Sequence, residues 1–438
     1  MSDSAEHAGD EPDEGKGARG RGGSAREAEE QGGDAPPASR ARFEALSAEH
    51  MPRDFSVSLD AYRRGGTDRF LGQERDEREE GTALVGFEPT YTDIVDYIVR
   101  ITHRIWEEKD IGYIYDTYSH DCRVWDDFGL QYGRDKIVAD TVHTNNAFPD
   151  IRLVADEVIW AGDETVGFHT SHRCRILGTN TGFSRYGPPT GRRIELWCIA
   201  NCVARDNEIF HEHVIYDTAG MLQQLGVDVV AMARRLGTSE SALVPNFAAG
   251  EPRRIVGQGK PARPPIPEDA GADIEAFVRA AFQRVWNRRD FAAIDRVYAP
   301  DILCQGSTGR VYRGHGQLRA FVLSMVAMFP DLALSVDDLY WMGSNPDEGF
   351  LVSIRWSATG THRGHGPYGE PTGREVHLWG ITQWTLEGSR VRREWMLFNE
   401  FGVLMQLHGA RSAAVRPGAS LPGPSRPDGE SHGGVPAP

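Results

Sequence analysis

The spacing of apolar residues predicts two long amphipathic helices, one near residue 100 and one near residue 280. In TDIVDYIVRITHRIW, apolar positions recur every three or four residues and form a single stripe of Ile94, Val95, Ile98, Ile101 and Ile105. In IEAFVRAAFQRVW, the same spacing gives a stripe of Ile274, Phe277, Val278, Ala281 and Val285. We therefore expect each helix to bury one face against the rest of its domain.

The same succession of elements is predicted after each helix. A short helix, a short strand and a third helix that ends at the sequence FPD come first, and four strand-like runs follow. The last run leads into a helix at AGMLQQLG in one case and at FGVLMQLHG in the other. Helices followed by a long antiparallel sheet predict an α+β domain with one sheet face packed on the helices. If the sheet curves, its concave side encloses a pocket.

The two halves of the pattern are copies of each other. YGPPTGRRIELW at residues 186–197 returns as YGEPTGREVHLW at residues 368–379, and matching landmarks keep an offset of 180 to 182 residues. These pairs are Trp106 and Trp286, Tyr118 and Tyr298, Asp121 and Asp301, Trp160 and Trp341, Thr179 and Thr361, Glu212 and Glu394, and Gly220 and Gly402. We predict tandem domains at 91–228 and 273–410, joined by a helix end and a Pro-rich linker at 229–272.

Composition separates the tails from these domains. The net charge is −16, and residues 1–90 hold 21 acidic against 12 basic residues with few aromatics, which predicts a disordered acidic tail. Residues 411–438 are rich in Pro and Gly and are expected to be disordered too. Without a basic stripe, nucleic acid is a poor partner. We see no membrane span and no secretory signal, so we expect a cytoplasmic protein whose five cysteines are small buried residues.

The order of these motifs resembles a known family. A Trp near the end of the first helix, FPD, G-T, PPTG-R, E-x-x-x-x-D and Q-L-G occur in both copies in the order typical of SnoaL-like polyketide cyclases of the nuclear transport factor 2 superfamily. The resemblance implies a cone-shaped α+β barrel with a deep apolar pocket. It also implies aldol-type cyclisation of a polyketide ester without a cofactor, driven by a pocket carboxylate. Since one fold hosts many activities, a binding protein or a hydrolase or dehydratase stays open.

The last strand of the first copy supplies the candidate catalytic residues. In EIFHEHVIYD, the two-residue period places His213 and Asp217 on one face with Ile209 and Ile215, and we predict that this face lines the pocket. Burial in an apolar pocket would raise the pKa of a carboxyl group towards the working pH. Asp217 also stands where the resembling cyclases carry their acid/base Asp.

The second copy departs from this pattern. Asn399 stands in the place of Asp217, and His377 stands in the place of Glu195. An amide cannot take up a proton at neutral pH, so we expect chemistry in the first copy and a binding or structural role for the second, in an intramolecular pseudo-dimer. Our other candidates for pocket residues are the aromatic side chains of Trp125, Trp197 and Trp395.

Simpler interpretations of the same residues stay open. Asp217 precedes Thr-Ala-Gly and could cap the following helix, and His213 could be a satisfied core histidine. The tryptophans could belong to the core alone. His211 and His213 have the spacing of a metal-binding pair, but no third ligand is placed by spacing, so we expect no metal. Three functional hypotheses stay open: a cyclase, a carrier of a small hydrophobic ligand and an interaction scaffold. Further homo-oligomers are also compatible with the sequence.

Overall fold

The computed structural model describes residues 46–53, 70–72, 84–237, 263–344 and 349–410. Both predicted domains fall within these ranges apart from residues 345–348. Most of the predicted N-terminal tail, the linker residues 238–262 and the C-terminal tail at 411–438 lie outside the described residues.

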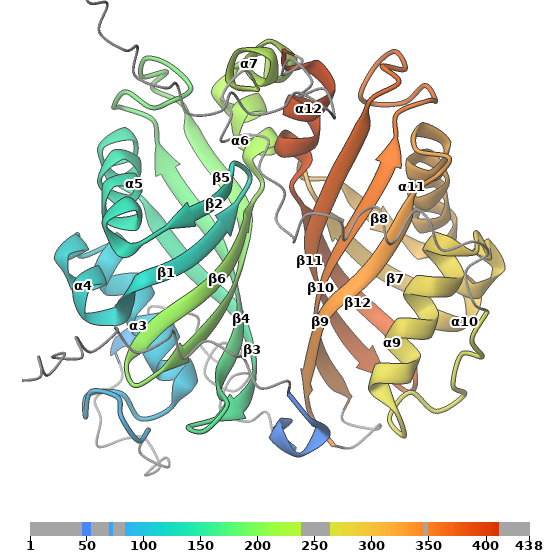
Figure 1. Ribbon diagram of the computed structural model, residues 1–438, viewed down its shortest axis with the longest axis horizontal. Helices are drawn as coiled ribbons and strands as arrows, with labels where there is room; N and C mark the ends of the chain where they lie inside the picture. Colours follow the sequence, from blue (N-terminus) through green and yellow to red (C-terminus); the bar gives the residue numbers. More distant parts are fainter. Residues whose placement is uncertain (1–45, 54–69, 73–83, 238–262, 345–348, 411–438) are drawn as a thin grey trace, which may run out of the picture. The chain divides into compact units, whose positions relative to one another are not determined.

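The first copy is a six-stranded sheet with helices on one face (Figure 1). The strands run in the order β2-β1-β6-β5-β4-β3, with β1 and β6 parallel and the other neighbours antiparallel. The elements are α3 (Ile94–Trp106), α4 (Ile114–Thr117), β1 (Tyr118–Asp126), β2 (Gly129–Tyr132), α5 (Arg134–Ala147), β3 (Arg152–Asp163), β4 (Gly167–Thr179), β5 (Arg193–Arg205), β6 (Glu208–Tyr216), α6 (Thr218–Leu225) and α7 (Val229–Leu236).

The second copy repeats this topology as β8-β7-β12-β11-β10-β9. Its elements are α9 (Ile274–Phe282), a π-helical turn (Gln283–Asn287), α10 (Ile294–Val297), β7 (Tyr298–Gly306), β8 (Val311–Arg313), α11 (Gly314–Met328), β9 (Ala333–Met342), β10 (Phe350–Thr361), β11 (Glu375–Glu387), β12 (Arg390–Phe398) and α12 (Glu400–His408). The predicted α+β class and the duplication are confirmed. The single short strand predicted before the third helix is a hairpin of two strands, so each sheet has six strands.

The first helix of each copy begins at an aspartate. The side chain of Asp93 accepts a hydrogen bond from the Asp96 amide at 2.8 Å, and that of Asp273 accepts one from Ala276 at 2.8 Å. Such capping satisfies an amide that has no partner within the helix. Every residue of the two predicted apolar stripes is buried, as the helical period predicts.

The repeated motifs connect loops to the sheet. The FPD aspartate of the first copy, Asp150, accepts hydrogen bonds from the amide and the hydroxyl of Thr179 at 2.6 and 2.7 Å. Asp331 and Thr361 make the same pair of bonds, both at 2.7 Å. These residues therefore tie the loop after the third helix to the end of the fourth strand, which explains why FPD and G-T recur together.

The repeated Gln-Leu pair holds the terminal helix in the same way. The Gln224 side chain accepts from the amide of Glu195 and donates to its carbonyl, both at 2.8 Å. Gln406 bonds the backbone of His377 at 2.8 and 2.9 Å. The doubled phrases thus have a structural role in each copy.

The sheet faces that turn away from the helices contact each other. Asn201 donates to the Ser353 hydroxyl at 3.2 Å, and the Gln383 amide donates to the Ser171 hydroxyl at 2.8 Å. An apolar cluster of Ile199, Ile215, Trp379, Ile381 and Leu397 lies at this contact. The central strands are therefore buried on both faces.

Part of the segment predicted as a disordered tail is ordered. Met51 is only 8% exposed, its sulfur accepts a hydrogen bond from the Trp341 amide, and Phe87 packs edge-on against Tyr97. The average composition of residues 1–90 did not predict this packing, because the few apolar residues are spread among many polar ones. Within the described ranges, no helix is long and apolar enough to cross a membrane.

Candidate functional site

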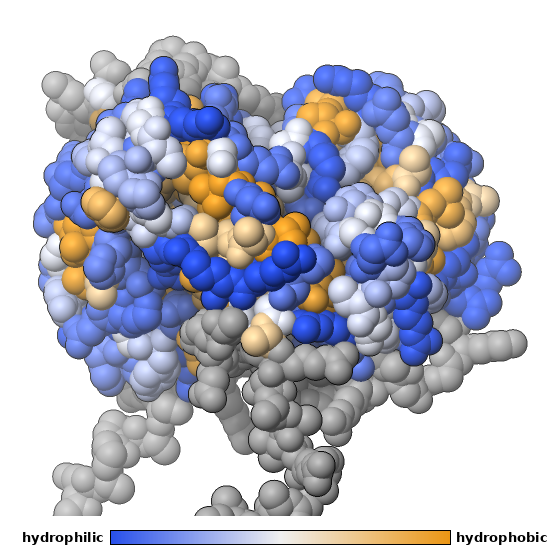
Figure 2. Space-filling view, turned by 90° about the horizontal axis from the view of Figure 1, so that it is seen from above, coloured by the Kyte–Doolittle hydropathy of each residue, from blue (hydrophilic) through white to orange (hydrophobic). Residues whose placement is uncertain are grey.

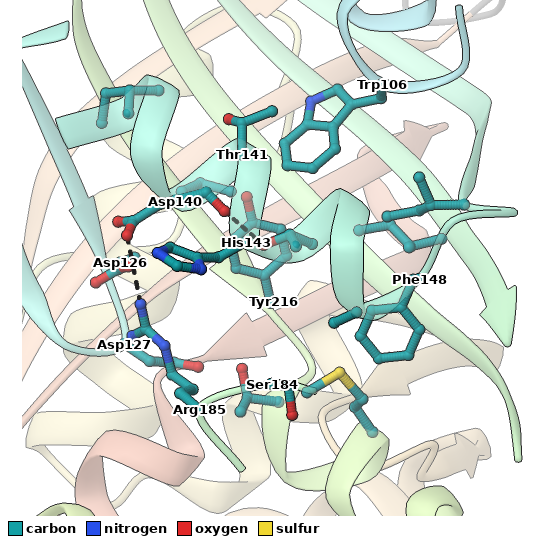
Figure 3. A pocket seen from close by; sticks show the side chains of 18 of the residues that line it. Trp106, Asp126, Asp127, Asp140, Thr141, His143, Phe148, Ser184, Arg185 and Tyr216 are labelled. Atoms are coloured by element: carbon teal, nitrogen blue, oxygen red, sulfur yellow. Dashed lines mark hydrogen bonds and ion pairs between the residues drawn. The ribbon is translucent and has the colours of Figure 1, made fainter. Parts of the chain in front are cut away.

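A cavity of about 740 Å³ lies inside the first copy, between α5 and the helix-covered face of the sheet. Its wall is mostly apolar and includes Trp106, Ile114, Val124, Phe148, Leu153, Ile176, Leu196, Val214 and Met221. Figure 3 shows Trp106, Phe148 and Tyr216 around this space. An apolar chamber with a few polar groups is the usual form of a site for a small organic ligand.

The polar groups gather where the cavity reaches solvent. Asp126 ends β1, His143 lies on α5, and Arg185 belongs to the loop between β4 and β5 (Figure 3). His143 and Arg185 are exposed, and Phe183 of the same loop is 70% exposed although it also lines the cavity. Figure 2 views the end of the sheets where α6 and α12 lie, and it shows apolar side chains among hydrophilic ones there.

Two adjacent carboxyl groups at this opening have raised pKa values. Burial raises the pKa of Asp126 to about 6, although its carboxylate accepts hydrogen bonds from the Phe128 amide at 2.7 Å and from Gln131 at 3.3 Å. Burial raises the pKa of Asp127 further, to about 8, with repulsion from nearby carboxylates in support. Near pH 7, Asp126 is then mainly ionised and Asp127 mainly protonated.

Arg185 supplies positive charge at the rim. Its guanidinium lies 3.5 Å from the Asp140 carboxylate and 4.4 Å from the centre of the Phe128 ring. The ion pair joins the β4–β5 loop to α5 across the opening (Figure 3). Because both partners are partly exposed, the pair contributes little to stability.

A third carboxyl group, that of Glu212, lies at the floor of the cavity. It accepts a hydrogen bond from the Tyr118 hydroxyl at 3.0 Å, and burial raises its pKa to about 7. Glu394 occupies the same place in the second copy, where burial also raises its pKa to about 7. Since this glutamate is present in both copies, we regard it as part of the common fold.

The second copy has almost no corresponding space. Its interior cavity measures about 10 Å³ in the part of the chain that the structure describes. Large apolar side chains replace the residues that line the first cavity: Met396 stands in place of Val214, Phe398 in place of Tyr216, Phe321 in place of Asp140 and Met325 in place of Thr144. Gly306 ends β7 where Asp126 ends β1. The second copy thus differs from the first both in the size of the interior cavity and in the residue at the position of Asp126.

Asp217 does not line this cavity. Its side chain accepts hydrogen bonds from the amide of Gly220, at the start of α6, and from the amides of Thr308 and Gly309 in the second copy, at 3.2, 2.6 and 3.1 Å. Burial raises its pKa against the effect of these bonds. The capping interaction weighed against catalysis is therefore present, and the acid/base role of Asp217 stays a prediction.

The predicted inward face of β6 was wrong by one residue. Glu212, Val214 and Tyr216 line the cavity, whereas the His213 ring stacks on Trp125 with centroids 4.7 Å apart and lies 5.7 Å from the Trp379 ring. His213 and Trp125 thus belong to the contact between the sheets. Both faces of β6 are buried, so alternation of apolar residues did not distinguish them.

The remaining predicted pocket residues also lie away from the cavity. Trp197 and Trp395 pack edge to face at 6.3 Å beside the apolar cluster between the sheets. The exposed Glu195 pairs with Arg175 at 3.0 Å, Asn399 accepts from the Trp379 amide at 3.0 Å, and the His377 backbone is held by Gln406. Sequence reasoning missed Asp126, Asp127, His143 and Arg185. Their signal was that a titratable side chain of the first copy is replaced in the second, where Gly306, Ser307, Ser324 and Pro367 stand at these positions.

The family comparison agrees with the duplicated fold. The family model for SnoaL-like polyketide cyclase matches the chain twice, over residues 97–225 and 276–407. The chain therefore belongs to the SnoaL-like polyketide cyclase family, and it carries the family's domain in tandem. None of the curated proteins matches the chain.

Solved structures with this fold include three bacterial proteins. A candidate SnoaL-like polyketide cyclase from Jannaschia sp. CCS1 is 17% identical, with a TM-score of 0.28, and the match covers 35% of this chain and 97% of that one. IdmH, a candidate polyketide cyclase from Streptomyces antibioticus, is 24% identical over 32% of this chain and 99% of its own, with a TM-score of 0.27. TsrD from Streptomyces laurentii is 21% identical over 32% and 97%, with a TM-score of 0.27.

Proposed function

We propose that the first copy catalyses an aldol-type ring closure of a polyketide ester or a related small hydrophobic compound, by acid/base chemistry without a cofactor. The observation that carries this proposal is the asymmetry between the copies. The first copy has an apolar cavity with carboxyl groups of raised pKa at its opening. Among the described residues of the second copy, the equivalent space measures about 10 Å³, and Gly306 and Ser307 replace the two aspartates.

In the proposed reaction, Asp126 is the base and Asp127 is the acid. The Asp126 carboxylate takes a proton from an activated carbon of the substrate, and the enolate that forms attacks a carbonyl carbon of the same molecule. The carbonyl oxygen takes up the proton of the Asp127 carboxyl group as the new carbon–carbon bond forms. A proton then passes from Asp126 to Asp127 through solvent at the opening. The product is an isomer of the substrate, so no atoms are lost.

The environment suits both steps. A general base works best when its pKa lies near the operating pH, and burial moves the pKa of Asp126 in that direction. Two carboxyl groups with separated pKa values provide one base and one acid at the same pH. The apolar wall folds the flexible chain so that the reacting carbons meet, which lowers the entropic cost of ring closure.

Proton abstraction can be measured without the natural substrate. A β-keto ester that bears a naphthyl group is incubated with the protein in D₂O, and deuterium uptake at its activated carbon is followed by NMR. We expect Asp126→Asn to slow the uptake by about two to four orders of magnitude while binding of the ester changes little. Binding without any exchange in the parent protein would instead support the carrier function.

Asp217→Asn is the matched comparison, because the second copy already has Asn399 at this position. We expect this variant to lose stability through weaker capping but to keep most of its exchange rate. If Asp217→Asn abolishes exchange in a folded protein while Asp126→Asn does not, the acid/base group is Asp217 and our assignment of Asp126 is wrong.

We also propose that the two copies form an intramolecular pseudo-dimer in which the second copy supports the first. The hydrogen bonds from Thr308 and Gly309 to Asp217 support this role, because they fix the start of α6 beside the cavity. The side chain of Arg173 on β4 lies 3.5 Å over the Trp395 ring of the second copy. Such contacts stabilise the wall of the cavity from outside.

A further inference from the structure

A second, smaller cavity lies behind the main one in the first copy. It measures about 60 Å³ and is enclosed by α3 and by β4, β5 and β6. Trp106, Tyr118, Glu212 and Tyr216 line both cavities, so the two spaces adjoin at these residues. We call this space the rear chamber.

The rear chamber contains a buried polar atom that has no partner. His172 lies on β4 with only 4% of its surface exposed, and its Nε2 atom makes no hydrogen bond within the described parts of the chain. Burial lowers the pKa of His172 to about 4, so its ring is neutral at physiological pH. A buried polar atom without a partner is destabilising, and this cost is recovered when a ligand or water provides the bond.

In the described residues of the second copy, larger side chains stand at the positions that line the chamber, and the imidazole is replaced. Ile354 stands in place of His172, and two tryptophans, Trp356 and Trp384, stand in place of Cys174 and Cys202. Both tryptophans are buried. Glu394, in contrast, retains the position of Glu212. The common fold thus requires the glutamate but requires neither the histidine nor the open space.

We propose that the rear chamber binds a small hydroxyl-bearing end of the substrate, with the imidazole of His172 as the hydrogen-bond partner of that hydroxyl group. A hydroxyl group both donates and accepts, so it pairs with the neutral imidazole in either tautomer. This inference rests on the proposed function in one respect, since it takes the occupant of the main cavity to be the substrate.

The chamber selects against anionic groups. With a neutral His172 and with Glu212 in its wall, a carboxylate would be buried without a counter-ion and beside another carboxyl group, which is unfavourable. The volume of about 60 Å³ admits a hydroxyl group with one or two neighbouring carbons and excludes a further ring. The fitting substrate is therefore a phenol, an enol or a short hydroxyalkyl end.

The chamber also fixes the position of the substrate relative to the proposed base. His172 on β4 pairs with Ala200 on β5, Ala200 pairs with Val214 on β6, and Asp126 follows Trp125, which pairs with His213 on β6. Asp126 therefore lies at the level of His172 but three strands away, which is roughly 14 Å at about 4.8 Å per strand. An anchored hydroxyl group would place the reacting carbons beside Asp126 in a substrate of about that length.

The test uses two probes of matched size, 2-naphthol and 2-methylnaphthalene, with binding to the full-length protein measured by isothermal titration calorimetry. We expect the parent protein to prefer 2-naphthol and His172→Ile, which copies the second domain, to lower that preference about tenfold. This change corresponds to about 1.4 kcal/mol. His172→Gln, which keeps a polar atom near Nε2, should restore part of the preference. Thermal unfolding of each variant checks the fold.

Three outcomes would contradict the proposed binding role of the rear chamber. The parent protein shows no preference for 2-naphthol, or His172→Ile leaves that preference unchanged, or a crystal structure with 2-naphthol shows only water at His172. Cys202→Leu narrows the chamber without touching His172, and it should lower the affinity for 2-naphthol as well. Asp126→Asn separates the two proposals. This variant should keep the preference for 2-naphthol while it loses deuterium exchange. If exchange fails, the binding role of His172 can still be correct, and if the preference fails, the role of Asp126 as base can still be correct.

Discussion

Asp126 and Asp127 are neighbours along the chain and burial raises the pKa of both. The pKa of Asp126 stays lower because Phe128, Gln131 and Arg185 favour its ionised form, whereas nearby carboxylates raise the pKa of Asp127 further. If Asp126 acts as base and Asp127 as acid, the rate of ring closure should rise as the pH passes about 6 and fall as it passes about 8, whereas deuterium exchange should show only the rise. Asp127→Asn should remove the decrease in rate above about pH 8 and should also lower the maximal rate. His143→Gln should leave both limbs in place; loss of the acidic limb in that variant would assign it to the imidazole at the opening.

The paired glutamates Glu212 and Glu394 make stability depend on pH. Burial raises the pKa of each to about 7 from 4.5, so the folded chain holds these protons more tightly than the unfolded chain does. Their contribution is complete below about pH 4.5 and is lost as the pH rises through 7. A shift of this size corresponds to roughly 3 kcal/mol for each group.

We therefore expect the double variant Glu212→Gln, Glu394→Gln to gain stability relative to the parent protein between pH 5 and 8. The measurement is urea unfolding at several pH values. Glu195→Gln, at an exposed ion pair, serves as the control and should follow the parent protein. A double variant with the parent's pH dependence would contradict a structural role for the two carboxyl groups.

Among the elements, the clamp between the loop after the third helix and the fourth strand is suited to a double-mutant cycle. In the second copy it consists of Asp331 and Thr361, joined by two hydrogen bonds of 2.7 Å. We expect Asp331→Ala to cost about 1–3 kcal/mol of unfolding free energy. Thr361→Val should add little once Asp331 is gone. Additive losses in urea unfolding would show that the two residues act separately.

The filled interior of the second copy can be tested at Trp356 on β10. This side chain is 3% exposed, and its indole donates to the Thr382 hydroxyl at 3.0 Å. Trp356→Ala should cost about 3–5 kcal/mol because it leaves a cavity and an unpaired hydroxyl. Cys174→Ala, at the equivalent place in the first copy, removes one sulfur atom and should cost much less. Equal losses on urea unfolding would mean that the second interior is not tightly packed.

The sequence predicted the elements better than the site. Helical stripes such as Ile94 to Ile105 have one buried face and one polar face, so their orientation can be read from the pattern. In β6, Val214 faces the cavity while Ile215 faces the other copy, and both are buried. When both faces of a strand are buried, the pattern of apolar residues does not predict which face lines a pocket. A comparison of the two copies does, at positions where one copy has a polar residue and the other an apolar one.

For the whole molecule, the contact between the copies does not depend on the linker. Gln383 of the second copy bonds both the carbonyl and the hydroxyl of Ser171 in the first, and Asn201 bonds Ser353. We expect that a protease site inserted between residues 245 and 250 can be cut without separating the halves on size-exclusion chromatography. Adding Gln383→Ala should weaken the association of the cut halves. Halves of the parent protein that elute apart after cleavage would contradict the pseudo-dimer.

The duplication within one chain has an evolutionary consequence. In a dimer of identical chains, every substitution occurs twice, so a tryptophan that fills one interior fills the other as well. Here each half has its own coding sequence within one gene. Trp356 therefore fills the interior of the second half, while Cys174 at the equivalent position leaves space in the first. If only the first half binds a ligand, as we propose, selection for ligand binding does not act on the second half. Covalent fusion allows a division of labour that a symmetric assembly of one gene product cannot inherit.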